Sequence, residues 1–226
     1  MKLIWQIITT LVRTISNALI APVWFSILSA IAGLFGSGLW SGFTKGWATG
    51  WTWAFNDTIG LIVTLVFAVL GLIHGIRLAQ AESYFDVSGF FAFLWDHSWS
   101  LPNTIIGSVW CLITIGIGID SSHSRGTGRL VLNSGVFPGF DTTIGNVTAG
   151  NSVDVHEGIH VWQARLFGPL LYPIWVVNYV FNTVIPWWLF FAHPANFGKY
   201  FVCGVYPYTL FELWAYAVQG SKPSCT

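Results

Sequence analysis

The sequence predicts a mainly α-helical, polytopic membrane protein of about four or five spans, with a small β-hairpin insertion before a helix that carries candidate metal ligands. Three observations predict this class. Hydrophobic residues form 54% of the chain and charged residues only 8%, whereas soluble domains carry roughly 25% charged residues. Several apolar runs approach the length that crosses a bilayer. A polar, turn-rich stretch precedes a segment with the pattern His-Glu-x-x-His.

We divide the chain into a transmembrane and interfacial helical region, 1–120, and a metal-site region with C-terminal membrane helices, 121–226. A lipid bilayer is therefore the expected surroundings, in a bacterial inner (cytoplasmic) membrane. The formal net charge is zero, and the sequence has no basic stripe or phosphate loop, so nucleic acid is not an expected partner. The cysteines Cys111, Cys203 and Cys225 are scattered, and their spacing indicates neither a zinc knuckle nor a disulfide framework.

The first apolar elements differ in polarity. Residues 4–20 mix polar side chains with Ile and Leu, which is typical of a retained signal anchor or of a helix lying at the membrane surface. Residues 18–35 are apolar enough to span. Residues 58–76 form the clearest span, and 103–119 are a further, shorter candidate. Between these two, the aromatic residues 90–99 favour an interfacial position.

Glycines recur at four-residue spacing in two places. Such spacing puts a smooth face on a helix, against which another backbone approaches closely; a Gly-rich interfacial loop is the alternative for the first stretch. We expect these Gly- and Trp-rich faces to contact other membrane subunits. The glycines are Gly38, Gly42, Gly46 and Gly50 in the first stretch, and Gly71 and Gly75 in the second.

Histidines at membrane depth are candidates for function. His74 lies near the end of the clearest span, and with His97 and His123 it is a candidate ligand for a pigment or haem. A hydrogen-bonded structural role is the alternative. The chain has no Cys-x-x-Cys-His motif for haem attachment.

Residues 120–151 change in character to Gly, Ser, Thr and Asn. Short alternating pieces such as 130–132 and 143–148 predict one or two β-hairpins at the membrane face. The segment that follows, 152–166, is predicted to be a helix with Ser152 as its N-cap, ended by Gly168 and Pro169. Residues 170–191 then form a span or a hairpin bent at its prolines, and 200–218 form the last apolar segment.

The predicted helix carries His156, Glu157 and His160. On a helix, the two histidines at i and i+4 leave the same face, one turn apart. Glu157 projects beside them and can take a proton from a water held there. Apolar neighbours favour a buried helix, where two histidines and a carboxylate need a partner such as a metal ion. Histidines satisfied by neighbouring polar groups are the alternative.

The pattern His-Glu-x-x-His resembles that of the zincin metallopeptidases. Residues 211–216 hold Glu212 in an apolar Glu-x-x-Ala stretch, which resembles the third-ligand helix of the gluzincin branch. The resemblance implies a Zn²⁺ ion held by His156, His160 and Glu212, with Glu157 as general base of peptide hydrolysis. An acidic residue often follows that alanine in gluzincins, and Tyr216 stands here instead; Asp154 is a possible substitute. The resemblance covers about residues 142–220.

The sequence leaves some roles open. A donor for the transition state is needed, and Tyr206, Tyr208 and His193 are candidates among which the sequence does not choose. Because Glu212 must be level with the metal helix, the chain has to return after residues 170–191, by a second crossing or a re-entrant hairpin. The alternative function is a non-catalytic structural or accessory subunit of a larger photosynthetic or respiratory membrane complex, built on a peptidase-like scaffold.

Overall fold

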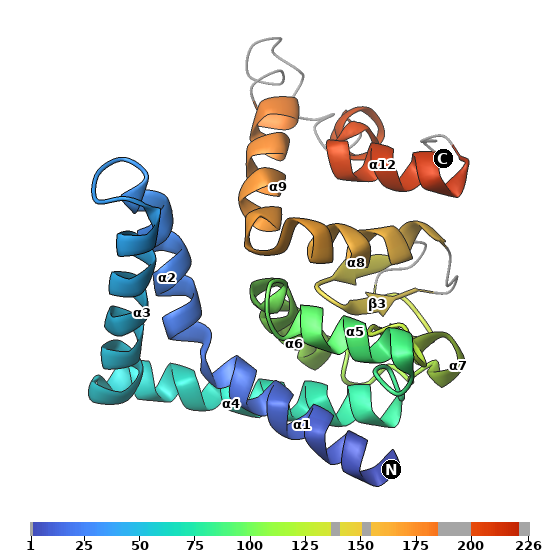
Figure 1. The fold of residues 1–226 in the computed structure, drawn as a ribbon. Coiled ribbons are helices and arrows are strands. Elements are labelled where there is room, and N and C mark those ends of the chain that lie inside the picture. The colour runs from blue at the N-terminus through green and yellow to red at the C-terminus, as the bar shows by residue number, and fades with distance from the viewer. Residues whose placement is uncertain (1, 137–140, 151–154, 185–199, 222–226) are drawn as a thin grey trace.

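The fold is that of a computed structural model, which describes residues 2–136, 141–150, 155–184 and 200–221. It is mainly helical with one small three-stranded sheet, as the sequence predicted (Figure 1). Helices α1 and α4 run along one another as a base, and the α2–α3 hairpin stands at one end of it (Figure 1). The sheet and the remaining helices are stacked over the other end. The N-terminal helices are α1 Lys2–Ala18, α2 Ile20–Gly33, α3 Leu39–Asn56, α4 Thr58–Gln80, α5 Val87–Asp96 and α6 Leu101–Ile113.

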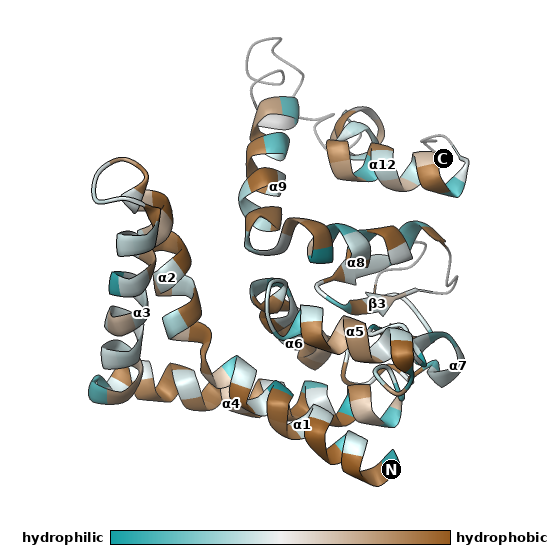
Figure 2. Ribbon diagram, in the orientation of Figure 1, coloured by the Kyte–Doolittle hydropathy of each residue, from teal (hydrophilic) through white to brown (hydrophobic). Residues whose placement is uncertain are grey.

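Helix α4 is the one unbroken helix of the described residues that is long and apolar enough to cross a membrane. It has 23 residues, and 33% of its most apolar window is buried inside the molecule, so most of this window is open to its surroundings. Helices α1 and α2 pass the same test only as a pair, bent by 53° at their junction. Figure 2 shows the apolar residues along these helices. One or two candidate spans are therefore found, and the expected four or five are not confirmed.

The expected span at 103–119 is a shorter helix. Helix α6 has 13 residues and ends at Ile113. The buried guanidinium of Arg77 on α4 donates to the carbonyl oxygens of Thr114, at 3.0 Å, and of Ile117. Arg77 thus donates to carbonyl groups just beyond the end of α6, where the carbonyl of Thr114 also accepts from the N–H of Ile117 at 3.0 Å.

The glycines make close contacts between helices of this chain. A Cβ at Gly42, Gly46 or Gly50 of α3 would lie within 2.5 Å of the α2 backbone, and one at Gly71 or Gly75 would overlap α1. Residues Leu39–Asn56 form helix α3, so the alternative of a Gly-rich loop around Gly42, Gly46 and Gly50 is wrong. Gly42, Gly46, Gly50, Gly71 and Gly75 are thus covered by the chain's own helices, whereas nothing lies within 4 Å of the Cβ position of Gly38. The expected contact with other subunits stays a prediction. Gly38 precedes α3 with a φ of +89°, which favours glycine there.

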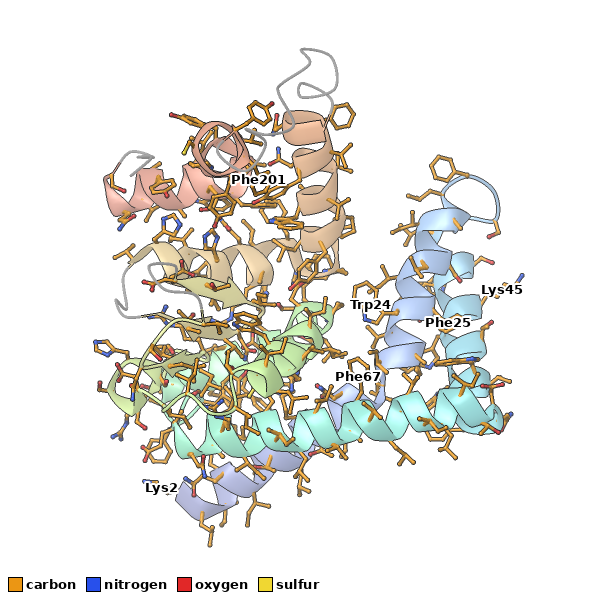
Figure 3. The ribbon with its side chains drawn as sticks, turned by 180° about the vertical axis from the view of Figure 1, so that it is seen from behind. Lys2, Trp24, Phe25, Lys45, Phe67 and Phe201 are labelled. Atoms are coloured by element: carbon orange, nitrogen blue, oxygen red, sulfur yellow. The ribbon has the colours of Figure 1, made fainter. Side chains whose placement is uncertain are left out.

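Side chains on the outer face of α3 are aromatic. Their rings follow one another at centroid distances of 4.9–6.5 Å. Trp40 is 72% and Phe55 is 52% exposed. Figure 3 shows Lys45 pointing away from the molecule on this hairpin, while Trp24 of α2 lies on the side that faces α9. The ladder consists of Trp40, Phe43, Trp47, Trp51 and Phe55.

The sheet confirms the strand-and-turn prediction. Strands β2, Thr142–Ile144, and β3, Val147–Ala149, form an antiparallel hairpin in which Ile144 pairs with Val147. The turn passes through Gly145 at a φ of +62°, which a glycine adopts without strain. Strand β1, Leu130–Leu132, pairs in parallel with β3, so the order is β1-β3-β2. The four-residue helix α7, Ser121–Ser124, precedes β1.

The C-terminal region turns back on itself. Helix α8, Val155–Phe167, continues through the 3₁₀ turn η1, Gly168–Leu170, into α9, Leu171–Tyr179, and the π-helical turn η2, Val180–Val184. The chain returns through η4, Phe201–Val205, and η5, Tyr206–Tyr208, to α12, Leu210–Gln219. Helix α12 packs on α8 (Figure 1). In the described residues 200–219, the returning chain is thus divided into short helical pieces, and it brings Glu212 level with α8.

The hydrophobic core lies beneath the sheet and joins residues from both sides of residue 120. It combines residues of α4, α5 and α6 with Leu130 and Leu132 of β1 and with Val147 and Ala149 of β3. A buried ion pair sits beside it, because Arg165 of α8 donates from Nε and Nη2 to Asp96 at 2.8 and 2.9 Å. The hydroxyl of Tyr84 donates to the same carboxylate at 2.9 Å. These contacts fix α8 against the end of α5.

Candidate metal centre

Helix α8 presents the two predicted histidines on one face. His156 and His160 lie one turn apart, with ring centroids 4.9 Å from one another. Ligand atoms of His156, Glu157 and His160 all lie within 4.8 Å of one another, and this group could hold a metal ion. The i, i+4 spacing therefore forms the cluster that the sequence predicted.

Glu212 reaches the same cluster from α12. Its carboxylate oxygens lie 3.0 Å from Nε2 of His156 and 3.5 Å from Nε2 of His160. The side chain is only 7% exposed. Glu212 is 56 residues from His156 in sequence, so the packing of α12 on α8 is what joins them. The structure thus brings together His156, Glu157, His160 and Glu212.

The ring of His160 is oriented by a residue that the sequence analysis missed. Its Nδ1 lies 2.8 Å from Oε1 of Gln163, and Nε2 of Gln163 donates to the carbonyl of Phe211 at 2.8 Å. The amide of Gln163 is fixed by this second bond, so its oxygen accepts from His160 Nδ1–H. In the neutral ring the lone pair is then on Nε2, toward Glu212, which is the form that binds a metal.

His156 lacks the corresponding support. Its buried Nδ1 finds no hydrogen-bond partner in the described part of the chain. The ring of Tyr216 lies against it, edge to face, at 4.6 Å. This is the position where the gluzincin pattern often carries a carboxylate. Asp154, the expected substitute, lies outside the described residues.

Glu157 is held by strand β2. The Thr143 hydroxyl donates to its Oε2 at 2.5 Å, and the hydroxyls of Thr143 and Thr148 lie 3.0 Å apart. Burial raises the pKa of Glu157 above its ordinary value, although the charge of His160 and the hydrogen bond from Thr143 oppose this. A carboxylate whose pKa is raised toward neutrality suits a general base.

The cluster favours a bound cation. Burial lowers the pKa of His160, but the hydrogen bond and charge of Glu212, together with the charge of Glu157, outweigh burial and raise it to about 9. Burial raises the pKa of Glu212, yet hydrogen bonds from His156 and His160 hold it at about 2. The same negative field attracts a proton or a metal ion. Two imidazoles and a carboxylate are the donor set that zinc takes in hydrolytic sites, so the residues present fit this ion.

A cavity of about 650 Å³ opens beside the cluster, between β2, α8, α9 and α12. Glu157, His160 and Glu212 line it, together with Tyr206. The Tyr206 side chain is hydrogen-bonded to Glu212. Of the two candidate donors that the structure describes, Tyr206 is therefore the one in contact with the cluster. Tyr208 is 53% exposed and is not among the residues that line the cavity, and His193 lies outside the described residues.

The C-terminal end of α8 is held by donors from α5 and α6. The amide of Asn103 donates to the carbonyls of Ala164 and Gly168 at 2.7 and 2.8 Å. The indoles of Trp95 and Trp99 donate to the next two carbonyls of the helix. These donors satisfy carbonyl groups that have no partner within the helix, and they fix the helix that carries the histidines.

The other histidines are hydrogen-bonded elsewhere. His74 Nδ1 lies 2.8 Å from Ser108 Oγ, and His97 Nδ1 lies 2.8 Å from the carbonyl of Phe93. His123 Nδ1 lies 2.7 Å from Asp120. None of the three lines the cavity, which favours a structural role over pigment or haem binding. The cysteines differ from expectation, since Cys111 is a buried free thiol but Cys203 is disulfide-bonded; the fold, and not sequence spacing, decides such pairing.

Comparisons with protein-family models, curated proteins and solved structures give no match. The likeness to zincins therefore rests on the residues of this cluster alone.

Proposed function

We propose that this chain is an integral-membrane zinc metallopeptidase, in a bacterial inner membrane. The observation that carries the proposal is the convergence of His156, His160 and Glu212, with Glu157 beside them. Three of these residues, Glu157, His160 and Glu212, line one apolar cavity. His156, His160 and Glu212 would hold the ion. A zinc ion held there would lower the pKa of a water molecule and polarise a peptide carbonyl.

The side chains supply the remaining chemistry. Glu157 takes a proton from water, whose oxygen adds to the carbonyl carbon. Glu157 then gives this proton to the amide nitrogen as the carbon–nitrogen bond breaks, which leaves a carboxylic acid and an amine. Thr143 holds the Glu157 carboxylate in place. Tyr206, which lines the cavity, would donate to the oxygen that gains negative charge.

The test is the metal content of the purified protein, measured by elemental analysis. We expect one zinc per chain, and a loss of zinc in both His156→Ala and Glu212→Ala. The matched control is His123→Ala, since this exposed histidine lies outside the cluster. In a second step, zinc content and hydrolysis of apolar peptides are compared between the wild type and Glu157→Gln. The variant should keep its zinc and lose the hydrolysis. Wild-type protein that is folded and binds no zinc contradicts the proposal.

A second candidate is a non-catalytic accessory subunit of a larger membrane complex. The aromatic ladder of α3 favours it, because Trp40, Trp51 and Phe55 are exposed on the α2–α3 hairpin, which stands away from the sheet and the metal centre (Figure 1). Aromatic residues are enriched in protein interfaces and also at membrane surfaces. Purification in mild detergent distinguishes the two functions, since an accessory subunit co-purifies in fixed stoichiometry with its complex and hydrolyses no peptide.

A further inference from the structure

The cavity beside the metal centre is larger than one side chain requires. Its volume of about 650 Å³ lies in the range of sites that enclose a whole small ligand. Apolar and aromatic side chains from α6, β2 and α9 and from the returning chain form most of its wall, including Ile106, Ile144, Leu171, Trp175 and Phe201. Figure 3 shows Phe201 between α9 and α12. Several consecutive apolar residues of a ligand therefore fit this space.

Apart from the metal-binding imidazole of His160, the described ionisable side chains that change the charge of the wall near neutral pH are acidic. Asp141, Glu157 and Glu212 line the cavity, and no Lys or Arg is among the described residues that do so. The nearby Arg165 is paired with Asp96 on the other side of α8. Binding a carboxylate in a largely apolar site requires a cationic or hydrogen-bonding partner. The wall thus disfavours acidic side chains and a free C-terminal carboxylate.

The backbone beside the cavity favours a peptide over a lipid chain. Strand β2 is the outer strand in the order β1-β3-β2, and its three residues line the cavity. An edge strand offers N–H and C=O groups that an extended peptide can use and an acyl chain cannot.

We propose that this cavity binds an uncharged, apolar stretch within a polypeptide and rejects acidic residues and free carboxyl termini. The site is then one for endopeptidase or N-terminal cleavage, and not for a carboxypeptidase. This inference rests on the proposed function, because it names the substrate class of the same site.

The experiment is photo-crosslinking of the full-length, zinc-loaded protein in detergent. The probes are acetyl-Ala-photoleucine-Phe-Leu as the C-terminal amide and the same peptide as the free acid, with the crosslinked residues mapped by mass spectrometry. We expect the amide to label residues of the cavity wall with an apparent affinity at least about tenfold higher than that of the acid, because away from the metal centre the acid finds no Lys or Arg among the described residues of the wall. A third probe is the C-terminal amide in which Glu replaces Phe, acetyl-Ala-photoleucine-Glu-Leu. It should bind as weakly as the free acid.

A cation placed on the wall should reverse this preference. In Ile106→Lys we expect the ratio of amide to acid binding to fall below about threefold. Leu171→Lys tests the opposite wall should the first variant fail to fold. The matched control is Ile113→Lys, on the same helix but outside the cavity, where the ratio should stay as in the wild type.

The two proposals fail separately. Equal or stronger binding of the free acid by the wild type, or crosslinks that lie outside the cavity wall, overturns the substrate class even where zinc is present. A protein without zinc that still prefers the amide overturns the peptidase and retains the peptide-binding cavity. Zinc content is therefore measured on the same samples.

Discussion

At the scale of single residues, the two histidines of the metal centre differ in the hydrogen bonds that orient their rings. His160 donates from Nδ1 to Gln163 at 2.8 Å, whereas Nδ1 of His156 has no acceptor in the described residues. Partners of this kind fix the ring of a metal-binding histidine and raise its basicity, and their loss typically costs 10–100-fold in metal affinity. The two histidines should therefore respond differently to changes around them.

We expect Gln163→Leu to weaken zinc binding by about 10–100-fold, because His160 then loses its acceptor. Tyr216→Asp should act in the opposite direction and tighten binding by about tenfold, since it supplies an acceptor beside His156. Both are measured by competition with a chelator of known zinc affinity. Gln80→Leu, an exposed position at the end of α4, is the control. Equal zinc affinities for wild type and Gln163→Leu would show that this hydrogen bond does not support the site.

A second prediction at this scale concerns how the free energy of unfolding changes with pH through His97. Burial, with the charge of Arg13, lowers the pKa of His97 to about 3, while the unfolded chain keeps a value of about 6.5. The stabilising effect of the neutral ring is fully present above pH 6.5 and is lost as pH falls toward 3, because the unfolded state binds the proton first. Between pH 7 and pH 5 we expect the free energy of unfolding to fall by about 2 kcal/mol from this group.

The comparison is with His97→Phe, which keeps an aromatic ring beside Phe93 and removes the titrating group. Denaturant unfolding in detergent at the two pH values gives the free energies. The variant should lose less stability than the wild type over this interval, and parallel losses would count against a neutral, buried His97.

At the scale of elements, sequence patterns predicted what depends on local spacing. The histidine pair follows from helix geometry, and the hairpin follows from alternation around Gly145. The contact of Thr143 with Glu157 depends on how the hairpin packs on α8, which no local pattern encodes. Gln163 carried a readable signal, because residues at i and i+3 share a helix face. The helix expected at 103–119 was predicted too long, because hydropathy does not show where a helix ends. Here α6 ends at Ile113, and the side chain of Arg77 donates to carbonyl groups beyond it.

Helix packing in the α2–α3 hairpin gives the prediction at this scale. In an exposed helix, Ala is more favourable than Gly by about 1 kcal/mol. At Gly46 the added Cβ would lie 2.2 Å from the carbonyl oxygen of Phe25, so Gly46→Ala should lower stability by about 1–3 kcal/mol. Gly36→Ala is the control, because nothing lies within 4 Å of its Cβ position. Thermal unfolding measures both, and a stabilised Gly46→Ala protein would mean that α2 and α3 are further apart.

At the scale of the whole molecule, the helical base and the metal region have different surfaces. Helix α4 carries exposed apolar residues such as Ile62, Leu65 and Val69 along its length, whereas α8 buries its histidine face under α12. Composition predicted the apolar exterior, since too few charged residues exist to cover the molecule. It did not predict how many segments cross a bilayer, because prolines, glycines and side-chain caps divide apolar stretches into pieces that are individually too short.

Membrane insertion is therefore tested best at α4. Val69 lies at the middle of this helix and is 54% exposed, so a lysine there faces lipid if α4 spans the bilayer. A charge at the centre of a spanning helix costs about 2.5–3.5 kcal/mol on the insertion scale. We expect Val69→Lys to reduce the fraction of protein that floats with lipid vesicles after carbonate washing, while Ser121→Lys, at an exposed position on α7, leaves it unchanged. If Val69→Lys floats as the wild type does, α4 does not cross the bilayer, and its apolar face is instead covered by another protein chain. The stability of the detergent-solubilised variant separates these cases from simple misfolding, because a folded Val69→Lys protein should keep the unfolding temperature of the wild type.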